Sequence, residues 1–311
     1  MAEQHNNFVV VYQPGKVAST SIVNSLNNID GIRAVQSHFL GKESLKSIVD
    51  SLVDTNQSEY FHRHRVGQFL NNLDITREIL CFREGHYPEK KLTIVSLVRD
   101  PFDWFRSSLS QDIEGYIPIF RRYADSMRII FDSDESLIMN SLPSILSHLY
   151  EAFDEIGGVD EFFSQKRPFN EMFLNFDKCL REDLINISCV FIRPFSWLDD
   201  HLSNFLLVNI DSFFEIFPLI LWKDLKWCGV YIIRYEDLPK SMQFIAKRMN
   251  IGALSLNKYN ISSEKILNYE INECFKTEKA VYLKKLCTET KYYNKFYRPS
   301  SPISNTSLRE G

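Results

Sequence analysis

Three apolar runs, each followed by a turn and a helical pattern, limit the folds that this 311-residue chain can adopt. The runs cover residues 8–12, 92–98 and 229–235, and β-branched residues lie in each of them. A continuous apolar run without polar alternation is typical of a strand that is covered on both faces, as parallel strands are. The pattern therefore predicts an α/β protein with a central, mostly parallel sheet flanked by helices.

Helix signals follow the strands. Gln13-Pro14-Gly15 ends the first strand, and apolar residues then recur at helical spacing from Val17 to a stop at Gly31. Arg99-Asp100-Pro101 directly follows the second run, with Asp100 as an N-cap and Pro101 as a first helical residue, so a helix should begin there. The other expected elements are a strand at 32–39, helices near 45–52, 66–73, 239–250 and 277–296, a mostly helical stretch over 115–224 with a short strand at 190–192, and a buried or amphipathic helix at 202–222.

One catalytic domain is expected over residues 1–298, because α/β enzymes of this size commonly form around one sheet. A largely helical insertion at about 110–225 would form its acceptor side, and the Ser- and Pro-rich tail at 299–311 should be disordered. No internal repeat is visible in the sequence.

Charge and cysteine usage exclude several classes of protein. A net charge of -4 argues against a general nucleic-acid binder, which needs a broad basic field. The six cysteines are spread singly, which predicts neither a disulfide framework nor a zinc site. The first residues lack the pattern of a signal peptide and no run suits a membrane span, so we expect a cytoplasmic protein without membrane insertion.

The turn after the first strand carries the parts of an anion site. Backbone N–H groups, hydroxyls and a lysine meet at a predicted helix N-terminus, where the helix dipole favours negative charge. A Walker A loop needs two glycines at a longer spacing, so the spacing excludes that motif. The candidate anion-binding residues are Gly15, Lys16, Val17, Ala18, Ser19, Thr20 and Ser21.

This segment resembles the 5′-phosphosulfate loop of sulfotransferases, especially carbohydrate sulfotransferases. Arg99 and Ser107 resemble the 3′-phosphate motif of the same family, in which an Arg and a Ser eight positions later bracket that phosphate. The resemblance covers residues 8–109 well and 229–250 moderately. It implies a P-loop-like three-layer fold, 3′-phosphoadenosine 5′-phosphosulfate (PAPS) as the donor, and 3′-phosphoadenosine 5′-phosphate (PAP) as the product.

The implied chemistry assigns a role to each charged residue. Charge builds on the bridging oxygen as the leaving phosphate departs, and Lys16 is the candidate catalytic cation there. Arg99 can give a two-pronged contact to the 3′-phosphate, with Ser107 and the loop hydroxyls as further donors. This scheme requires no metal.

An acceptor hydroxyl also needs a base with a pKa near neutrality. His38, at the end of the second predicted strand, is the leading candidate, and it resembles the Ser-His or Thr-His on the corresponding strand of several sulfotransferases. A histidine that merely satisfies a strand end is the competing interpretation. His62 and His64 are rival bases, although their alternation with arginines also fits a solvated helix face.

The expected activity is transfer of a sulfuryl group to a hydroxyl of a carbohydrate or glycan precursor. Asn175-Phe176-Asp177 faintly resembles bacterial proteins described as putative capsular polysaccharide synthesis proteins, which share the Lys-Val-Ala-Ser-Thr-Ser loop. Animal carbohydrate sulfotransferases carry a membrane anchor that this sequence does not show, so we expect a bacterial cytosolic enzyme and not a Golgi protein. Asp237 is expected to cap the helix after the last strand, and Glu236 to pair with a basic group. The alternatives are a non-catalytic PAP-binding accessory protein of polysaccharide assembly and, less favoured by the loop spacing, a Mg²⁺-dependent kinase. The sequence indicates neither the acceptor nor an oligomeric state.

Overall fold

The computed structural model describes residues 6–53, 59–165, 169–217, 220–252, 254–256 and 267–298. The chain forms two compact units. The sheet unit consists of Met1–Arg99 with Ser196–Asn260, and the helical unit consists of Asp100–Phe195 with Ile261–Gly311. The prediction of one catalytic domain over 1–298 stays a prediction, since this division says nothing about shared function.

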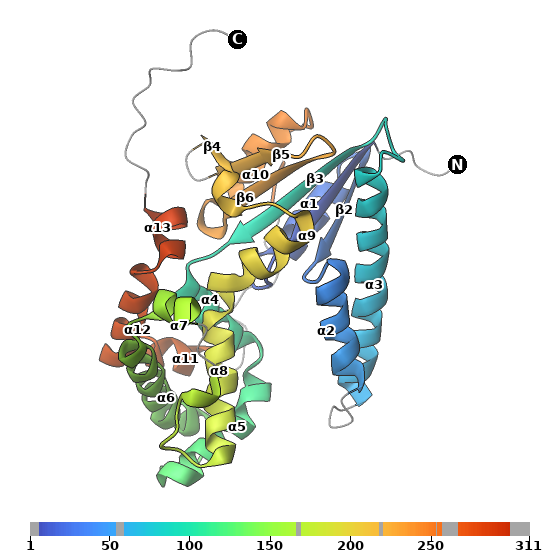
Figure 1. Cartoon of the computed structure of the whole chain (residues 1–311). Helices are drawn as coiled ribbons and strands as arrows, with labels where there is room; N and C mark the ends of the chain where they lie inside the picture. Colours follow the sequence, from blue (N-terminus) through green and yellow to red (C-terminus); the bar gives the residue numbers. More distant parts are fainter. Residues whose placement is uncertain are drawn as a thin grey trace. The chain divides into compact units, whose positions relative to one another are not determined.

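The described part of the sheet unit contains a six-stranded, mostly parallel sheet in the order β2-β1-β3-β6-β5-β4 (Figure 1). The pairs β1–β2, β1–β3 and β3–β6 are parallel, whereas β5 runs antiparallel to β6 and β4 antiparallel to β5. The strands are β1 (Asn7–Tyr12), β2 (Ile32–Ser37), β3 (Lys91–Val98), β4 (Phe214–Phe217), β5 (Ile220–Asp224) and β6 (Cys228–Arg234).

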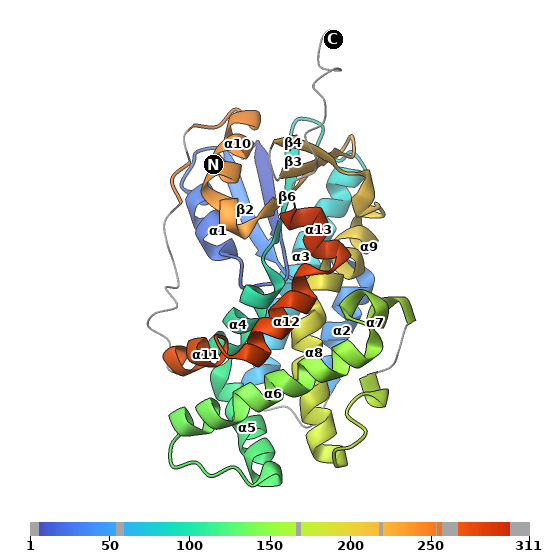
Figure 2. The same ribbon diagram turned by 90° about the vertical axis from the view of Figure 1, so that its left-hand side faces the viewer.

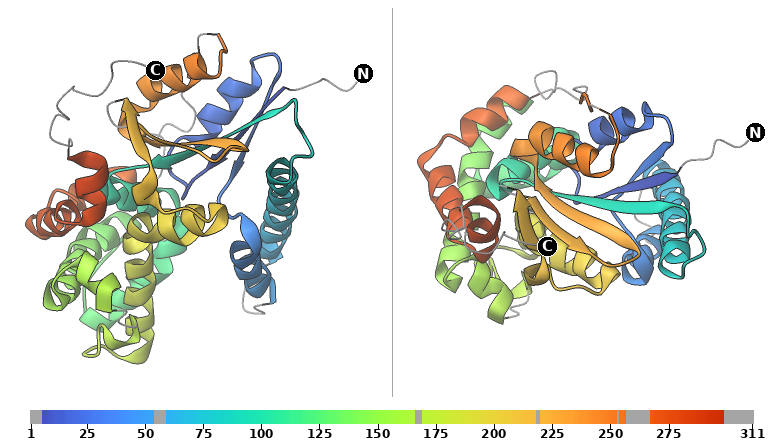
Figure 3. Two further views of the ribbon diagram at one scale, coloured as in Figure 1. Left: turned by 45° about the horizontal axis from the view of Figure 1, so that its top comes forward. Right: turned by 90° about the horizontal axis from the view of Figure 1, so that it is seen from above.

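Helices cover both faces of this sheet. Helices α1 (Ser19–Asn27) and α10 (Leu238–Arg248) lie on one face, and α2 (Gly41–Val53) and α3 (Glu59–Arg83) lie on the other (Figures 2 and 3). Because both faces are covered, the middle of β1 is apolar on both sides: Val9, Val10 and Val11 have no exposed surface. The predicted α/β class with a mostly parallel sheet is confirmed.

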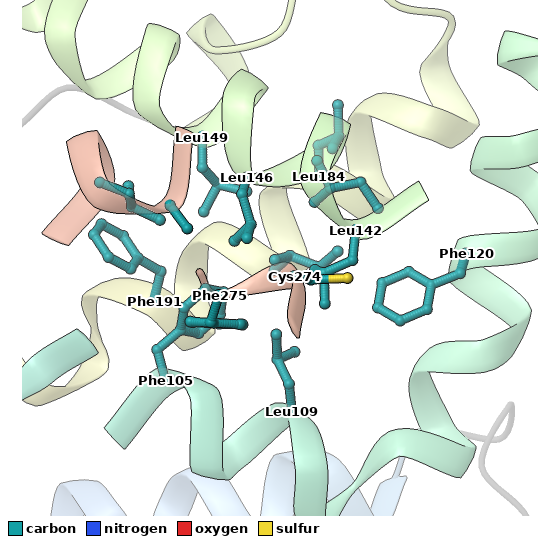
Figure 4. Close-up of a cluster of buried hydrophobic side chains, with 14 of the residues drawn as sticks. Phe105, Leu109, Phe120, Leu142, Leu146, Leu149, Leu184, Phe191, Cys274 and Phe275 are labelled. Carbon is teal, nitrogen blue, oxygen red and sulfur yellow. The ribbon is translucent and has the colours of Figure 1, made fainter. Parts of the chain in front are cut away.

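The helical unit is built around its own apolar cluster. Its helices are α4 (Pro101–Gln111), α5 (Ile113–Met127), α6 (Asp134–Ile156), α7 (Val159–Gln165), α8 (Lys178–Trp197), α11 (Asn268–Cys274), α12 (Glu278–Thr288) and α13 (Lys291–Tyr297), with the end of α8 belonging to the sheet unit. Side chains of α4, α5, α6 and α8, with Phe275 directly after α11, converge in the core, among them Phe105, Phe120, Leu146 and Phe191 (Figure 4). Helix α6 contacts α5, α11 and α12.

Two local predictions in the middle of the chain are wrong. The expected strand at 190–192 lies inside α8, where Leu184, Ile187 and Phe191 are buried at helical spacing. The expected helix at 202–222 is replaced by two short helical turns and then by β4 and β5. Pairing with β6 extends the sheet here, and this tertiary contact outweighs the local helical spacing.

The predicted helix at 277–296 is also divided, into α12 and α13. Thr290 stands between them, and its side-chain hydroxyl accepts a hydrogen bond from the N–H of Tyr293 at 3.1 Å. The same hydroxyl donates to the carbonyl oxygen of Cys287 at 2.8 Å. A buried threonine that serves both helix ends favours a break over a continuous helix.

The strands expected at 8–12, 32–39, 92–98 and 229–235 are confirmed as β1, β2, β3 and β6. Asp100 caps α4 as expected, because its side chain accepts from the N–H of Asp103 at 3.1 Å. In the described ranges of the chain, no helix combines the length and apolar composition needed to cross a bilayer. The tail at 299–311 lies outside the described residues.

Candidate functional site

Four parallel strands end at one edge of the sheet, and each is followed by polar residues. Gln13 follows β1, His38 follows β2, Arg99 follows β3 and Tyr235 follows β6. The chain passes from β1 to β2 on one side and returns to β3 on the other, so the strand order reverses beside β1. Ligands of open α/β sheets bind outside the carboxyl ends of the strands at such a point.

The loop between β1 and α1 has an unusual backbone. Gly15, Lys16 and Ala18 have φ values of 90°, 60° and 60°. A positive φ costs a residue with a Cβ about 1–2 kcal/mol, and such strain clusters at ligand sites. Backbone N–H groups in alternating conformations can form a concave nest for an anion.

Helix α1 begins at this loop without a side-chain cap. Its N-cap is Ala18, which has no side-chain oxygen to accept from the first-turn N–H groups, and no acidic residue lies in the first turn. By contrast, Asp100 caps α4 and Ser133 caps α6. Since the first turn of a helix leaves N–H donors without intrahelical partners, the start of α1 suits an anionic ligand.

Arg99 braces the loop from the neighbouring strand. Its Nη1 donates to the carbonyl oxygen of Lys16 at 2.8 Å, and its guanidinium lies 4.6 Å from the ring centre of Tyr235. The side chain is half-buried and stacked, so it is held in one orientation. The bond to Lys16 uses one of the five N–H donors of the guanidinium.

His38 lies beside the same loop. Its Nδ1 is 2.8 Å from the carbonyl oxygen of Gln13, and its Cε1 is 4.0 Å from the position that a Cβ on Gly15 would occupy. Ser37 precedes it and is anchored by Asn72, whose Oδ1 accepts from the serine hydroxyl at 2.7 Å. The structure thus brings the predicted base next to the predicted anion loop.

The remaining predicted site residues are distributed unevenly. Ser19 and Ser21 are buried on α1, Thr20 is half-buried, and Val17 is in the core. Ser107 lies on α4 in the helical unit, so the structure places it only relative to that unit. The side chains of His62 and His64 lie outside what the structure describes.

Asp237 stands at the N-cap position of α10, so the expectation that this residue caps the helix holds for its position but not for its side chain. Its side chain makes no capping hydrogen bond and instead accepts from Nε of Arg234 at 2.6 Å, in an ion pair. The guanidinium has a charge and the backbone N–H does not, so it is the stronger partner for the carboxylate. Glu236 is exposed on the same turn.

A second histidine near this edge was missed by the sequence reasoning. His201 is on a single π-helical turn, Leu198–Ser203, and its Nδ1 is 3.1 Å from Oγ of Ser44. Its ring lies 5.4 Å from that of Trp197 and 6.1 Å from that of Phe39, the residue after His38. In the sequence, His201 is a single histidine in a helical stretch and belongs to no recognisable motif. The π-helical turn that holds it is of a kind frequent at functional sites, but such a turn cannot be predicted from sequence.

The described part of the chain contains no group of three or more His, Cys, Asp or Glu residues arranged to hold a metal ion. Comparisons with protein-family models, with curated proteins and with solved structures found no match to this chain.

Proposed function

We propose that this protein is a PAPS-dependent sulfotransferase with a P-loop-like sheet unit, and that its acceptor is a hydroxyl of a carbohydrate or glycan precursor. The observation that carries the proposal is the uncapped start of α1 at the switch point of the sheet, next to Gly15 and Lys16. A helix whose N-cap residue supplies no side-chain acceptor and which has a lysine in the preceding turn has the composition of a phosphate or phosphosulfate site.

The residues of the sheet unit fit the donor nucleotide. The strained turn and the first residues of α1, from Gly15 to Ser21, would hold the 5′-phosphosulfate. Arg99 would hold the 3′-phosphate, and its existing contacts with Lys16 and Tyr235 fix its guanidinium beforehand. Ser107, which belongs to the helical unit, is the second donor that the resemblance implies.

The nucleotide supplies an activated sulfuryl group, and this chain supplies the charges around it. Lys16 is a positioned cation that stabilises the negative charge of the leaving phosphate oxygen. His38 takes the proton of the attacking hydroxyl, which makes that oxygen a better nucleophile. Phe39, which is half-buried beside His38 and His201, offers an apolar face on which a sugar ring can stack.

The experiment is calorimetric titration of the Lys16→Ala variant with PAP. Lys226→Ala is a matched control, because Lys226 is an exposed lysine of the same unit that also has a positive φ, of 68°. We expect Lys16→Ala to weaken PAP binding by about 10-fold or more, the scale of one lost charged contact, and Lys226→Ala to bind as the unaltered protein does. Equal binding by all three proteins would contradict the proposed site.

Transfer is tested with labelled PAPS and a panel of sugars and glycans. We expect sulfation of at least one acceptor, and a loss of rate of about 10²-fold or more in His38→Ala, the usual scale for a general base. PAP binding without transfer to any acceptor would instead support a non-catalytic accessory protein. Mg²⁺-dependent ATP hydrolysis would indicate a kinase-like enzyme.

A further inference from the structure

Gln13 is a fully buried polar residue, with 0% of its surface exposed, at the end of β1. A buried amide is costly unless it is hydrogen-bonded. Its Oε1 accepts a hydrogen bond from the N–H of Gly15, and its Nε2 lies 3.2 Å from Nδ1 of His38. One side chain therefore touches both the anion loop and the histidine.

The orientation of this amide follows from its partner on the loop. The backbone N–H of Gly15 can only donate, so the oxygen of the Gln13 amide must face it and the NH₂ group must face His38. The carbonyl oxygen of Gln13 lies 2.8 Å from the same Nδ1, and a carbonyl can only accept. The two contacts at Nδ1 therefore require opposite protonation states of that nitrogen.

The carbonyl contact decides between them. A lone pair on Nδ1 would lie 2.8 Å from the lone pairs of the carbonyl oxygen, and the two would repel each other. A proton on Nδ1 converts this short contact into a good hydrogen bond and leaves only the longer 3.2 Å contact with the NH₂ group unfavourable. The neutral ring then carries its lone pair on Nε2.

We infer that Gln13 is a positioning residue: its backbone carbonyl holds His38 in the Nδ1–H tautomer, and its side-chain oxygen ties the N–H of Gly15 in the anion loop to the same residue. The other tautomer would direct the ring's lone pair at Gln13, where it could take no proton from an acceptor. The catalytic meaning of this arrangement rests on the proposed function, whereas the tautomer itself does not.

The test is nitrogen NMR of the full-length protein labelled with ¹⁵N at its histidine rings, at a pH where His38 is neutral. The His38 signals are assigned by their loss in His38→Gln, or in His38→Asn if the first variant does not fold. We expect a protonated Nδ1 and an unprotonated Nε2. A ring protonated on Nε2 would overturn the inference.

The side-chain role is tested in uniformly ¹⁵N-labelled protein. Gln13→Met keeps the backbone carbonyl and removes the NH₂ group that opposes a proton on Nδ1, so the Nδ1–H tautomer should persist, whereas loss of the acceptor of the Gly15 N–H should shift the amide signal of Gly15. Gln13→Glu places one carboxylate oxygen against the Gly15 N–H and the other against Nδ1 of His38, so the Nδ1–H tautomer should persist. Gln36→Met is the matched control, because Oε1 of Gln36 has no hydrogen-bond partner among the described residues. A change to the Nε2–H tautomer in Gln13→Met would overturn the assignment of the tautomer to the backbone carbonyl, and an unshifted Gly15 amide signal would show that the side chain does not hold the loop.

The outcome is separable from that of the proposed function. A protein that does not bind PAP but shows the Nδ1–H tautomer would contradict the sulfotransferase proposal and leave the role of Gln13 intact. A protein that binds PAP but shows the Nε2–H tautomer would do the reverse.

Discussion

Replacing Gly15 by alanine separates the role of the anion loop in binding from its role in folding. Gly15 has a φ of 90°, which an alanine adopts only with strain. The added Cβ would lie 4.0 Å from Cε1 of His38, an ordinary van der Waals distance, so the side chain itself fits. The perturbation is therefore confined to the backbone of the loop.

The magnitude follows from two opposing terms. A positive φ costs an alanine about 1–2 kcal/mol in the folded state. Alanine also has less conformational freedom than glycine in the unfolded chain, and this difference stabilises the folded state by about 0.4–1 kcal/mol. We expect a net loss of about 1 kcal/mol in the free energy of unfolding. Relief of the strain moves the loop, and the loss of even one aligned N–H donor to a charged group weakens PAP binding by about 10-fold or more.

Gly31→Ala is the matched control for this substitution. Gly31 lies in the same unit, has a φ of 75°, and would place its Cβ in open space. Denaturant unfolding followed by tryptophan fluorescence should show similar losses of stability for both variants, and calorimetry should show weaker PAP binding for Gly15→Ala alone. Unchanged PAP binding by Gly15→Ala, or an equal loss by Gly31→Ala, would refute the reasoning.

Three further predictions concern folding and reactivity. Burial raises the pKa of Asp100, so the ionisation of this carboxyl opposes folding. Asp100→Asn keeps the helix cap without the charge, so urea unfolding should show that it gains stability relative to the unaltered protein as pH rises from about 4 to 7. Asp100→Ala removes the cap and should lose about 1 kcal/mol in the same measurement. Gly41→Ala combines a φ of 80° with a Cβ 2.8 Å from Cδ2 of Phe205, so we expect it to cost about 2–4 kcal/mol in the free energy of unfolding. In a double-mutant cycle, this cost should be smaller when Phe205 is replaced by Leu. An equal cost in both backgrounds would exclude the clash. Cys179 is exposed and should react first with a thiol reagent. Burial raises the pKa of the Cys287 thiol well above its usual value, so Cys287 should react only on unfolding. Rapid labelling of Cys287 in the folded protein would contradict this packing.

The four parallel strands were predictable because they are defined by local signals. Val9 to Val11 form a short β-branched apolar run that is typical of a strand covered on both faces, and Asp100 with Pro101 marks the start of α4. These patterns depend on neighbouring residues, so they can be read without knowledge of the tertiary structure.

The errors lie where distant contacts decide. β5 forms because it can pair with the free side of β6, and β4 then pairs with β5. No local feature of residues 202–222 indicates that a strand will be available for this pairing. Asp237 has the sequence position of an N-cap, but the side chain of Arg234 competes for its carboxylate. In each case a tertiary or charged partner outweighs a weak local preference.

The candidate site was predictable to a similar degree. Gly15, Lys16, Arg99 and His38 were identified from the sequence, and the structure places them at one sheet edge, with Arg99 bonded to Lys16 and His38 beside Gly15. The bracing of the loop by Arg99 could not be predicted, because it joins residues 83 positions apart. The approach of His201 to the same edge was equally invisible, since it depends on the fold of the intervening chain.

The most direct test of the sulfotransferase account is calorimetric titration of the unaltered protein with PAP and with ADP, each with and without Mg²⁺. The account predicts that PAP binds in the absence of Mg²⁺ and more tightly than ADP, because only PAP carries the 3′-phosphate that Arg99 would hold. Failure to bind PAP, or tighter binding of ADP that depends on Mg²⁺, would contradict it.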